Sequence, residues 1–99
     1  MILVDDRQDE RKKLYPLLEP HGAKLAHLEY GDISFSGRGP EDAIWSIGIE
    51  RKTLWDLKAS SMSGRLAGHQ LPGMRNVYNV AYLLVEGQYV LTSSGFVKI

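Results

Sequence analysis

Alternating and helically spaced apolar residues divide the first part of the chain into a strand, a helix and a second strand. Residues 2–4 form a short apolar run followed by two aspartates, which predicts a buried strand whose carboxyl end reaches a polar site. Residues 9–19 predict a helix, because acids come first, bases follow and three leucines recur at helical spacing. Pro20 and Gly22 end this helix, and residues 24–30 then alternate as a strand does.

The middle of the chain predicts a hairpin. Residues 33–36 alternate between apolar and polar, residues 37–40 have the Gly and Pro content of a turn, and residues 43–49 carry an apolar residue at every second position. Asp32 and Glu50 therefore flank the two strands of one hairpin.

The pattern after this hairpin changes to helical spacing. Residues 53–58 predict a short helix, residues 60–64 a flexible polar interruption, and residues 65–76 an amphipathic helix that Pro72 and Gly73 should kink or break. Residues 78–85 are the most hydrophobic stretch and predict a central strand buried on both faces.

The last residues predict a small closing hairpin, with strands at 88–92 and 96–99. Strands of mixed direction that alternate with helices in this order predict an α/β fold with a mixed central sheet flanked by helices.

Composition limits the protein class. A chain of 99 residues with 43% hydrophobic and 24% charged residues has the size and composition of one ordinary folded domain. The absence of cysteine excludes disulfides, a thiol nucleophile and cysteine-ligated zinc. Because no apolar run is long enough to span a membrane and the first residues are too charged for a signal peptide, we expect no membrane partner and a cytoplasmic or nuclear location.

The formal net charge of +0 conceals an asymmetry. Residues 1–50 carry ten acids and six bases, whereas residues 51–99 carry two acids and six bases. The chain is therefore acidic in its first half and basic in its second half, which a neutral total does not reveal.

Acidic residues are expected to meet at one edge of the predicted sheet. Asp5 or Asp6 follows the first strand, Asp32 begins the hairpin, and Glu50 ends it. Strand alternation places Glu50 and Lys52 on the same face. Crowded carboxylates favour Mg²⁺ or Mn²⁺, and a nearby lysine can orient or help deprotonate a water for attack on a phosphodiester. For any one of these residues taken alone, a solvated strand end is the more common explanation.

The same residues resemble the GDXnERKX3D signature of the XPF-type structure-specific endonucleases. The matching residues are Gly31, Asp32, Glu50, Arg51, Lys52 and Asp56. Residues 4–7 (VDDR) are similar to the VDxRE opening of that family, residues 63–66 (SGRL) to its NGRL segment, and residues 81–86 (AYLLVE) to its LLIE strand. The resemblance covers about residues 2–87.

The resemblance implies a restriction-endonuclease-like core with Mg²⁺ or Mn²⁺ as cofactor and no small-molecule cofactor. It implies that Asp32 and Glu50 are metal ligands, with Asp5 as a further ligand, and that Lys52 is the catalytic lysine. Arg51 and Asp56 complete the catalytic set. The candidate DNA contacts are Arg7, Lys58, Arg65, His69 and Arg75. The resemblance implies some of them, and the others are candidates because they are basic residues in the stretch that flanks the predicted site.

The sequence departs from the family pattern at several places. Gln8 stands where the family has glutamate, and His69, followed by Gln70, stands where it has glutamine. The helix-hairpin-helix modules that follow the nuclease domain in family members have no counterpart in these 99 residues. We therefore expect a single nuclease domain over residues 1–99, either compact in itself or shortened at its C-terminus.

Some residues have two interpretations. Trp45 and Trp55 could stack on bases, but core packing is the more common role of such residues. The three histidines have no zinc-like spacing, and Arg38 is expected at a hairpin tip.

The expected function is a metal-dependent DNA endonuclease that cuts branched, flap or junction DNA, with a homodimer as a further expectation. The alternatives are a catalytically silent DNA-binding or dimerisation partner of the same fold, and a nuclease of this fold with another target, such as RNA.

Overall fold

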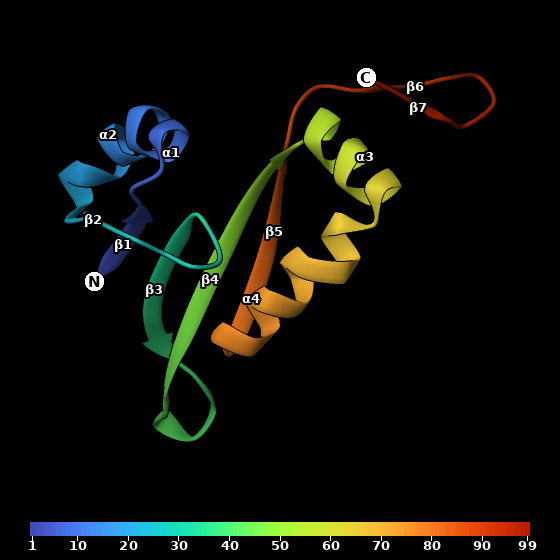
Figure 1. The fold of residues 1–99 in the computed structure, drawn as a ribbon. Helices are drawn as coiled ribbons and strands as arrows, with labels where there is room; N and C mark the ends of the chain where they lie inside the picture. The colour runs from blue at the N-terminus through green and yellow to red at the C-terminus, as the bar shows by residue number, and fades with distance from the viewer.

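A mixed five-stranded sheet forms the centre of the molecule in the computed structural model, which describes residues 1–99 apart from the side chains of residues 66 and 67. Its strands are β1 (Ile2–Asp5), β2 (Lys24–Ala26), β3 (Ile33–Arg38), β4 (Ile44–Thr53) and β5 (Val80–Glu86). They lie in the order β2-β1-β3-β4-β5 (Figure 1). The two outer pairs, β1 with β2 and β4 with β5, are parallel, whereas β3 is antiparallel to both its neighbours. The predicted α/β fold is confirmed.

The first helical region lies beside β1 and β2 (Figure 1) and is divided. The single helix predicted over residues 9–19 is wrong: α1 (Gln8–Lys13) ends before Leu14, and α2 (Tyr15–Leu18) and the 3-10 turn η1 (Glu19–His21) follow. Pro16 explains the division, because it has no N–H for the hydrogen bond one turn back and is tolerated in a first turn. Strand β2 is also shorter than the strand predicted over residues 24–30.

The second helical region packs against β4 and β5. Helix α3 (Leu54–Ser63) runs through the segment 60–64 that was predicted to be a flexible interruption, so that prediction is wrong. The reason is that Ser60 is fully buried and its hydroxyl accepts hydrogen bonds from Lys52 Nζ and Arg65 Nη2, at 3.3 and 2.9 Å. Thr53 caps the start of the helix, and Gly64 ends it with φ of 76°.

The remaining helical segments are the π-helical turn η3 (Leu66–Gln70) and helix α4 (Leu71–Val77). The predicted break in the segment 65–76 is confirmed, since it is divided between η3 and α4 next to Pro72. Pro72 lies in the first turn of α4, where its missing N–H is not needed. In the described part of the chain, no helix is both long and apolar enough to cross a membrane.

The most hydrophobic segment of the chain is an edge strand. Residues 78–85 were predicted to form a central strand buried on both faces, but β5 pairs with β4 on one side and ends the sheet. Its Tyr82 is 59% exposed, and Leu84 and Val85 are also exposed. The prediction was wrong because hydrophobicity indicates that a residue favours burial, not which element would bury it.

Both predicted hairpins are present in the structure. The predicted hairpin of β3 and β4 is confirmed and turns through the 3-10 segment η2 (Pro40–Asp42). The predicted closing hairpin is also confirmed, as β6 (Val90–Leu91) paired with β7 (Val97–Lys98) in a separate small sheet next to α3 (Figure 1).

Core residues lie on both faces of the sheet. Val4 and Ile33 are paired across β1 and β3 and share one face. Met74 and Tyr78, from α4 and its end, cover the other face, where the ring of Tyr78 lies over Gly48 of β4. The Tyr78 hydroxyl donates a 2.6 Å hydrogen bond to the carbonyl oxygen of Tyr30. This bond ties the segment that precedes Asp32 to the helical layer.

A Gly48→Ala substitution is expected to lower the free energy of unfolding by roughly 1–3 kcal/mol, because the core is close-packed and an added methyl group must displace its neighbours. A Cβ at this position of β4 would lie 2.2 Å from the ring of Tyr78. Urea denaturation followed by circular dichroism measures the change. Gly68→Ala is the matched control, since a Cβ there meets nothing within 4 Å. Equal unfolding midpoints for the two variants would show that Tyr78 does not pack against β4 as described.

Candidate active site

Asp32 is held at the junction of three strands. Its N–H donates to the Ile49 carbonyl at 2.7 Å, and its own carbonyl accepts from Asp5 N–H at 2.9 Å. Gly31 precedes it with φ of 89°, a left-handed conformation that glycine adopts without strain. The side-chain Oδ2 accepts a 2.7 Å hydrogen bond from the backbone N–H of Arg51. The Asp32 carboxylate is thereby fixed beside the second half of β4.

Asp32, which is buried, and Glu50, which is half-buried, form the carboxylate pair of the site. The pKa of Asp32 is raised to about 6. Burial is the main cause, the hydrogen bond from the Arg51 N–H opposes it, and the charge of Glu50 adds to the rise. Burial also raises the pKa of Glu50, against the lowering effects of Lys52 and Arg7. Asp32 is 6% exposed. Because burial raises the pKa of both carboxyls and the charge of Glu50 also raises that of Asp32, a bound cation would stabilise their charged forms.

Lys52 lies on the same face of β4 as Glu50, as strand alternation predicts. Its side chain is buried, with 8% of the residue exposed, and its Nζ donates to Ser60 Oγ at 3.3 Å. Its charge lowers the pKa of Glu50. The ammonium group is therefore fixed by α3 near the carboxylate pair.

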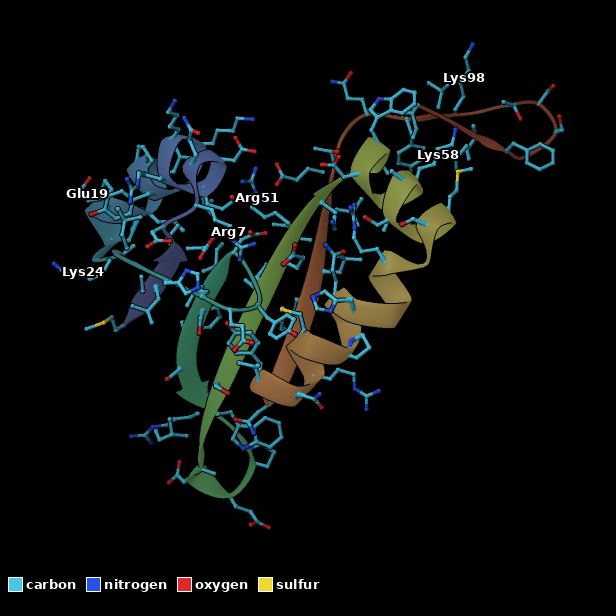
Figure 2. The ribbon with its side chains drawn as sticks, viewed as in Figure 1. Arg7, Glu19, Lys24, Arg51, Lys58 and Lys98 are labelled. Carbon is cyan, nitrogen blue, oxygen red and sulfur yellow. The ribbon has the colours of Figure 1, made fainter. Side chains whose placement is uncertain are left out.

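Arg51 connects three elements around the site. Its Nε donates to Glu86 Oε1 of β5 at 2.5 Å, and its Nη1 lies 3.7 Å from Glu10 Oε1 of α1. The hydrogen bond with Glu86 is the main reason that the pKa of Arg51 is raised. Figure 2 shows Arg51 between α1 and the end of β4. With its guanidinium paired to two acids and its N–H bonded to Asp32, Arg51 supports the site.

Glu10 is a residue of this site that the sequence reasoning missed. Its side chain is 15% exposed, and burial and the charge of Asp32 raise its pKa. One feature of the sequence could have indicated this role: the family pattern has an acid where Gln8 stands, and Glu10 is an acid in the first turn of the same helix. Glu10 lines a cavity of about 110 Å³ together with Arg51, Lys52 and Asp56, so α1 contributes to one wall of the site.

Asp5 and Arg7 form a tight local unit at the end of β1. Asp5 is fully buried; its Oδ1 accepts from Leu28 N–H at 2.9 Å, and its Oδ2 accepts from Arg7 Nε. Arg7 Nη2 in turn donates to the Leu28 carbonyl at 3.0 Å, and Figure 2 shows Arg7 near Arg51. Both oxygens of Asp5 thus have protein donors, an arrangement that orders the loop between β2 and β3.

The predicted metal ligands are not all equally close. Among the described side chains, the group that places three ligand atoms within 4.8 Å of one another is Asp5, Asp6 and His27. Asp5, Asp32 and Glu50 do not reach that mutual separation. Asp5 is engaged by Arg7, so the carboxylates that remain for a cation in the predicted site are those of Asp32 and Glu50.

The residues predicted to contact DNA do not form one cluster around Asp32 and Glu50. His69 packs against the Tyr30 ring, with centroids 5.6 Å apart, and lines a cavity of about 100 Å³ with Glu50 and Arg7. Arg65 is exposed and bonded to Ser60 at the end of α3. Lys58 and Arg75 lie on α3 and α4, and the grooves that they line do not include Asp32 or Glu50.

The donor set fits a hard divalent cation. Asp32 and Glu50 offer carboxylate oxygens, which Mg²⁺ and Mn²⁺ prefer, and because burial raises the pKa of both, a bound cation would stabilise their charged forms.

The mixed sheet flanked by helices is an XPF-like nuclease fold, similar to that of two solved structures of XPF from Aeropyrum pernix. One, described as a complex with DNA, matches with a TM-score of 0.64 and 27% identity over 95% of this chain and 42% of that chain. The other matches with a TM-score of 0.64 and 29% identity, over 88% and 40% of the respective chains. The chain thus spans about two fifths of these proteins. Neither a protein-family model nor a curated protein sequence matches it.

Proposed function

We propose that this protein is a metal-dependent DNA endonuclease that hydrolyses phosphodiester bonds. The observation that supports the proposal best is the pair of carboxylates of Asp32 and Glu50, whose pKa values are raised by burial, with the buried Lys52 on the same face of β4 as Glu50. Its occurrence in an XPF-like fold adds to that support, because one of the similar structures is an XPF complex with DNA.

Each residue has a distinct task in this proposal. Asp32 and Glu50 would hold Mg²⁺ or Mn²⁺, which when bound supplies a nucleophilic water of lowered pKa and stabilises charge on the phosphate. Lys52 orients the attacking water or takes part in its deprotonation, and Ser60 holds the lysine in place. Arg51 fixes Asp32 through its backbone N–H, and Glu10 and Glu86 fix Arg51.

We propose branched or flapped DNA as the substrate. Basic side chains on α3, just after it and on α4, the helices that follow the strand of Glu50 and Lys52, would contact phosphates. These residues are Lys58, Arg65 and Arg75. Binding through them should weaken steeply as the salt concentration rises.

The test is cleavage of flap, fork, Holliday-junction and linear duplex DNA in Mg²⁺ or Mn²⁺, with EDTA and matched RNA substrates as controls. We expect metal-dependent products from at least one branched DNA, faster than from linear duplex. Binding without any product would support the silent partner instead, and cleavage of RNA alone would identify a different target. Either result overturns the proposal.

We also propose that a second copy of the chain covers the open edge of β5. This strand is unpaired on its outer side and exposes Tyr82, Leu84 and Val85. An apolar edge strand is normally protected by pairing or by a partner surface. Sedimentation velocity should give a dimer that Tyr82→Glu dissociates, and a wild-type monomer at all concentrations would contradict this.

A further inference from the structure

An exposed tryptophan lies at the start of α3. Trp55 is 62% exposed, so the interpretation of this residue as part of the core is wrong. Trp45, by contrast, is half-buried against Gly39 of its own hairpin turn and is not one of the buried core residues. A large aromatic side chain left in water forgoes its burial free energy, and such residues are common at binding surfaces. Nothing in the proposed hydrolysis explains the position of Trp55.

A basic side chain accompanies this ring. Lys58 follows Trp55 by three positions on α3, and its Nζ lies 5.7 Å from the ring centroid. This is the distance at which an ammonium group is attracted to an aromatic face. The ammonium therefore lies over one face of the ring, and the other face is the one on which a base would stack.

The ring and the lysine line a groove of about 450 Å³ between α3 and the hairpin of β6 and β7. The rest of the lining is a second lysine, Lys98, the hydroxyl-bearing Thr92 and the apolar Val97 and Ile99, and none of these side chains is acidic. Figure 2 shows Lys58 and Lys98 on neighbouring elements, α3 and the hairpin. The groove thus combines an aromatic platform with two positive charges.

This combination favours a polyanion that carries flat rings. A purely apolar groove would suit another protein surface, but two ammonium groups without an acid favour phosphates. Single-stranded nucleic acid binds to surfaces that offer stacking rings beside basic groups, because every base has a face to stack.

We propose that this groove binds one unpaired DNA strand, with a base stacked on Trp55 and phosphates paired with Lys58 and Lys98. The inference rests on the proposed function for the choice of DNA. Trp55 follows Lys52 by three residues, and three residues of backbone span at most about 11 Å. The backbone of Trp55 therefore lies within about 11 Å of the backbone of Lys52. Asp32 and Glu50 do not line the groove, and the strand held in it would be the unpaired arm of a branched substrate.

The test measures binding of a fluorescent oligothymidylate of about 12 nucleotides in EDTA, where no cleavage occurs. Trp55→Ala is expected to weaken binding about 5- to 100-fold, whereas Trp55→Phe keeps most of the affinity. Replacing Lys58 and Lys98 with Gln should reduce the slope of log affinity against log salt by about 1.4, the value for two phosphates on a single strand. Lys24→Gln, an exposed lysine on β2, is the control and should change neither quantity.

Two further measurements separate this inference from the proposed hydrolysis. Asp32→Asn should bind the oligonucleotide as the wild type does, because it leaves the groove intact. If wild-type protein binds through Trp55 but cleaves nothing, the hydrolysis fails and the groove remains. If Trp55→Ala and the double lysine variant bind the oligothymidylate as the wild type does, the groove is not a single-strand site. The same conclusion follows if Trp55→Ala weakens binding to linear duplex DNA as much as it weakens binding to the oligothymidylate.

Discussion

A Lys52→Met variant is expected to cleave DNA about 100- to 10,000-fold more slowly than the wild type, the range lost when a positioned acid–base group is removed. Lys52 is buried beside Glu50 and fixed by Ser60, so its ammonium cannot be replaced by a neighbouring lysine. Methionine keeps the length of the side chain and removes the charge, which keeps the packing against α3.

Single-turnover cleavage at saturating Mn²⁺ measures the rate of the Lys52 variant. Lys24→Met, an exposed lysine on β2, is the matched control and should retain the wild-type rate. Circular dichroism and urea unfolding confirm that both variants fold. A Lys52→Met variant that folds and cleaves within a few-fold of the wild type would remove Lys52 from the chemistry.

An Asp32→Asn variant is expected to lose cleavage and to gain stability at neutral pH. The folded-state pKa of Asp32 is raised from 3.8 to about 6, so the folded state binds a proton more tightly than the unfolded state does. The stability that the protonated carboxyl gives at low pH is therefore lost as pH rises from about 3.8 to 6. Asparagine stays neutral and can still accept from Arg51 N–H. Above pH 6 the variant should be more stable by about 1–3 kcal/mol.

Urea titrations from pH 4 to pH 8 in EDTA measure this difference. The free energies of unfolding of wild type and Asp32→Asn should nearly coincide at pH 4, separate as pH rises to 6, and stay separated above it. Glu19→Gln, an exposed acid, is the control and should show no such change. A variant that is less stable than the wild type at pH 8 would show that Asp32 is not a strained buried carboxylate. In the cleavage assay, the same variant should be at least about a thousandfold slower, because metal and water positioning supply most of the acceleration.

Local sequence patterns predicted the strands because the alternation of apolar and polar residues follows directly from the two faces of a sheet. The hairpin of β3 and β4 and the shared face of Glu50 and Lys52 follow from a period of two and a turn of glycine and proline. The break of the first helix at Leu14 could also have been predicted, since Pro16 was visible in the sequence.

Contacts between distant parts of the chain could not be predicted in this way. Arg51 meets Glu86 and Glu10 from 35 and 41 positions away, and no local pattern reports such a meeting. Ser60 lies in a polar stretch that was predicted to be flexible, yet it is helical and buried because its hydroxyl accepts hydrogen bonds from Lys52 and Arg65. The place of β5 at the sheet edge depends on strand order, which hydrophobicity does not encode.

Anomalous diffraction from crystals grown with Mn²⁺ tests the central claim most directly, because it locates the cation without relying on activity. The structure offers two places for it: the carboxylate pair of Asp32 and Glu50, and the group of Asp5, Asp6 and His27. We predict a peak between the carboxylates of Asp32 and Glu50 that is absent in the Asp32→Asn variant. A peak at Asp5, Asp6 and His27 alone, or no peak at the carboxylate pair at saturating Mn²⁺, would contradict the assignment of this site.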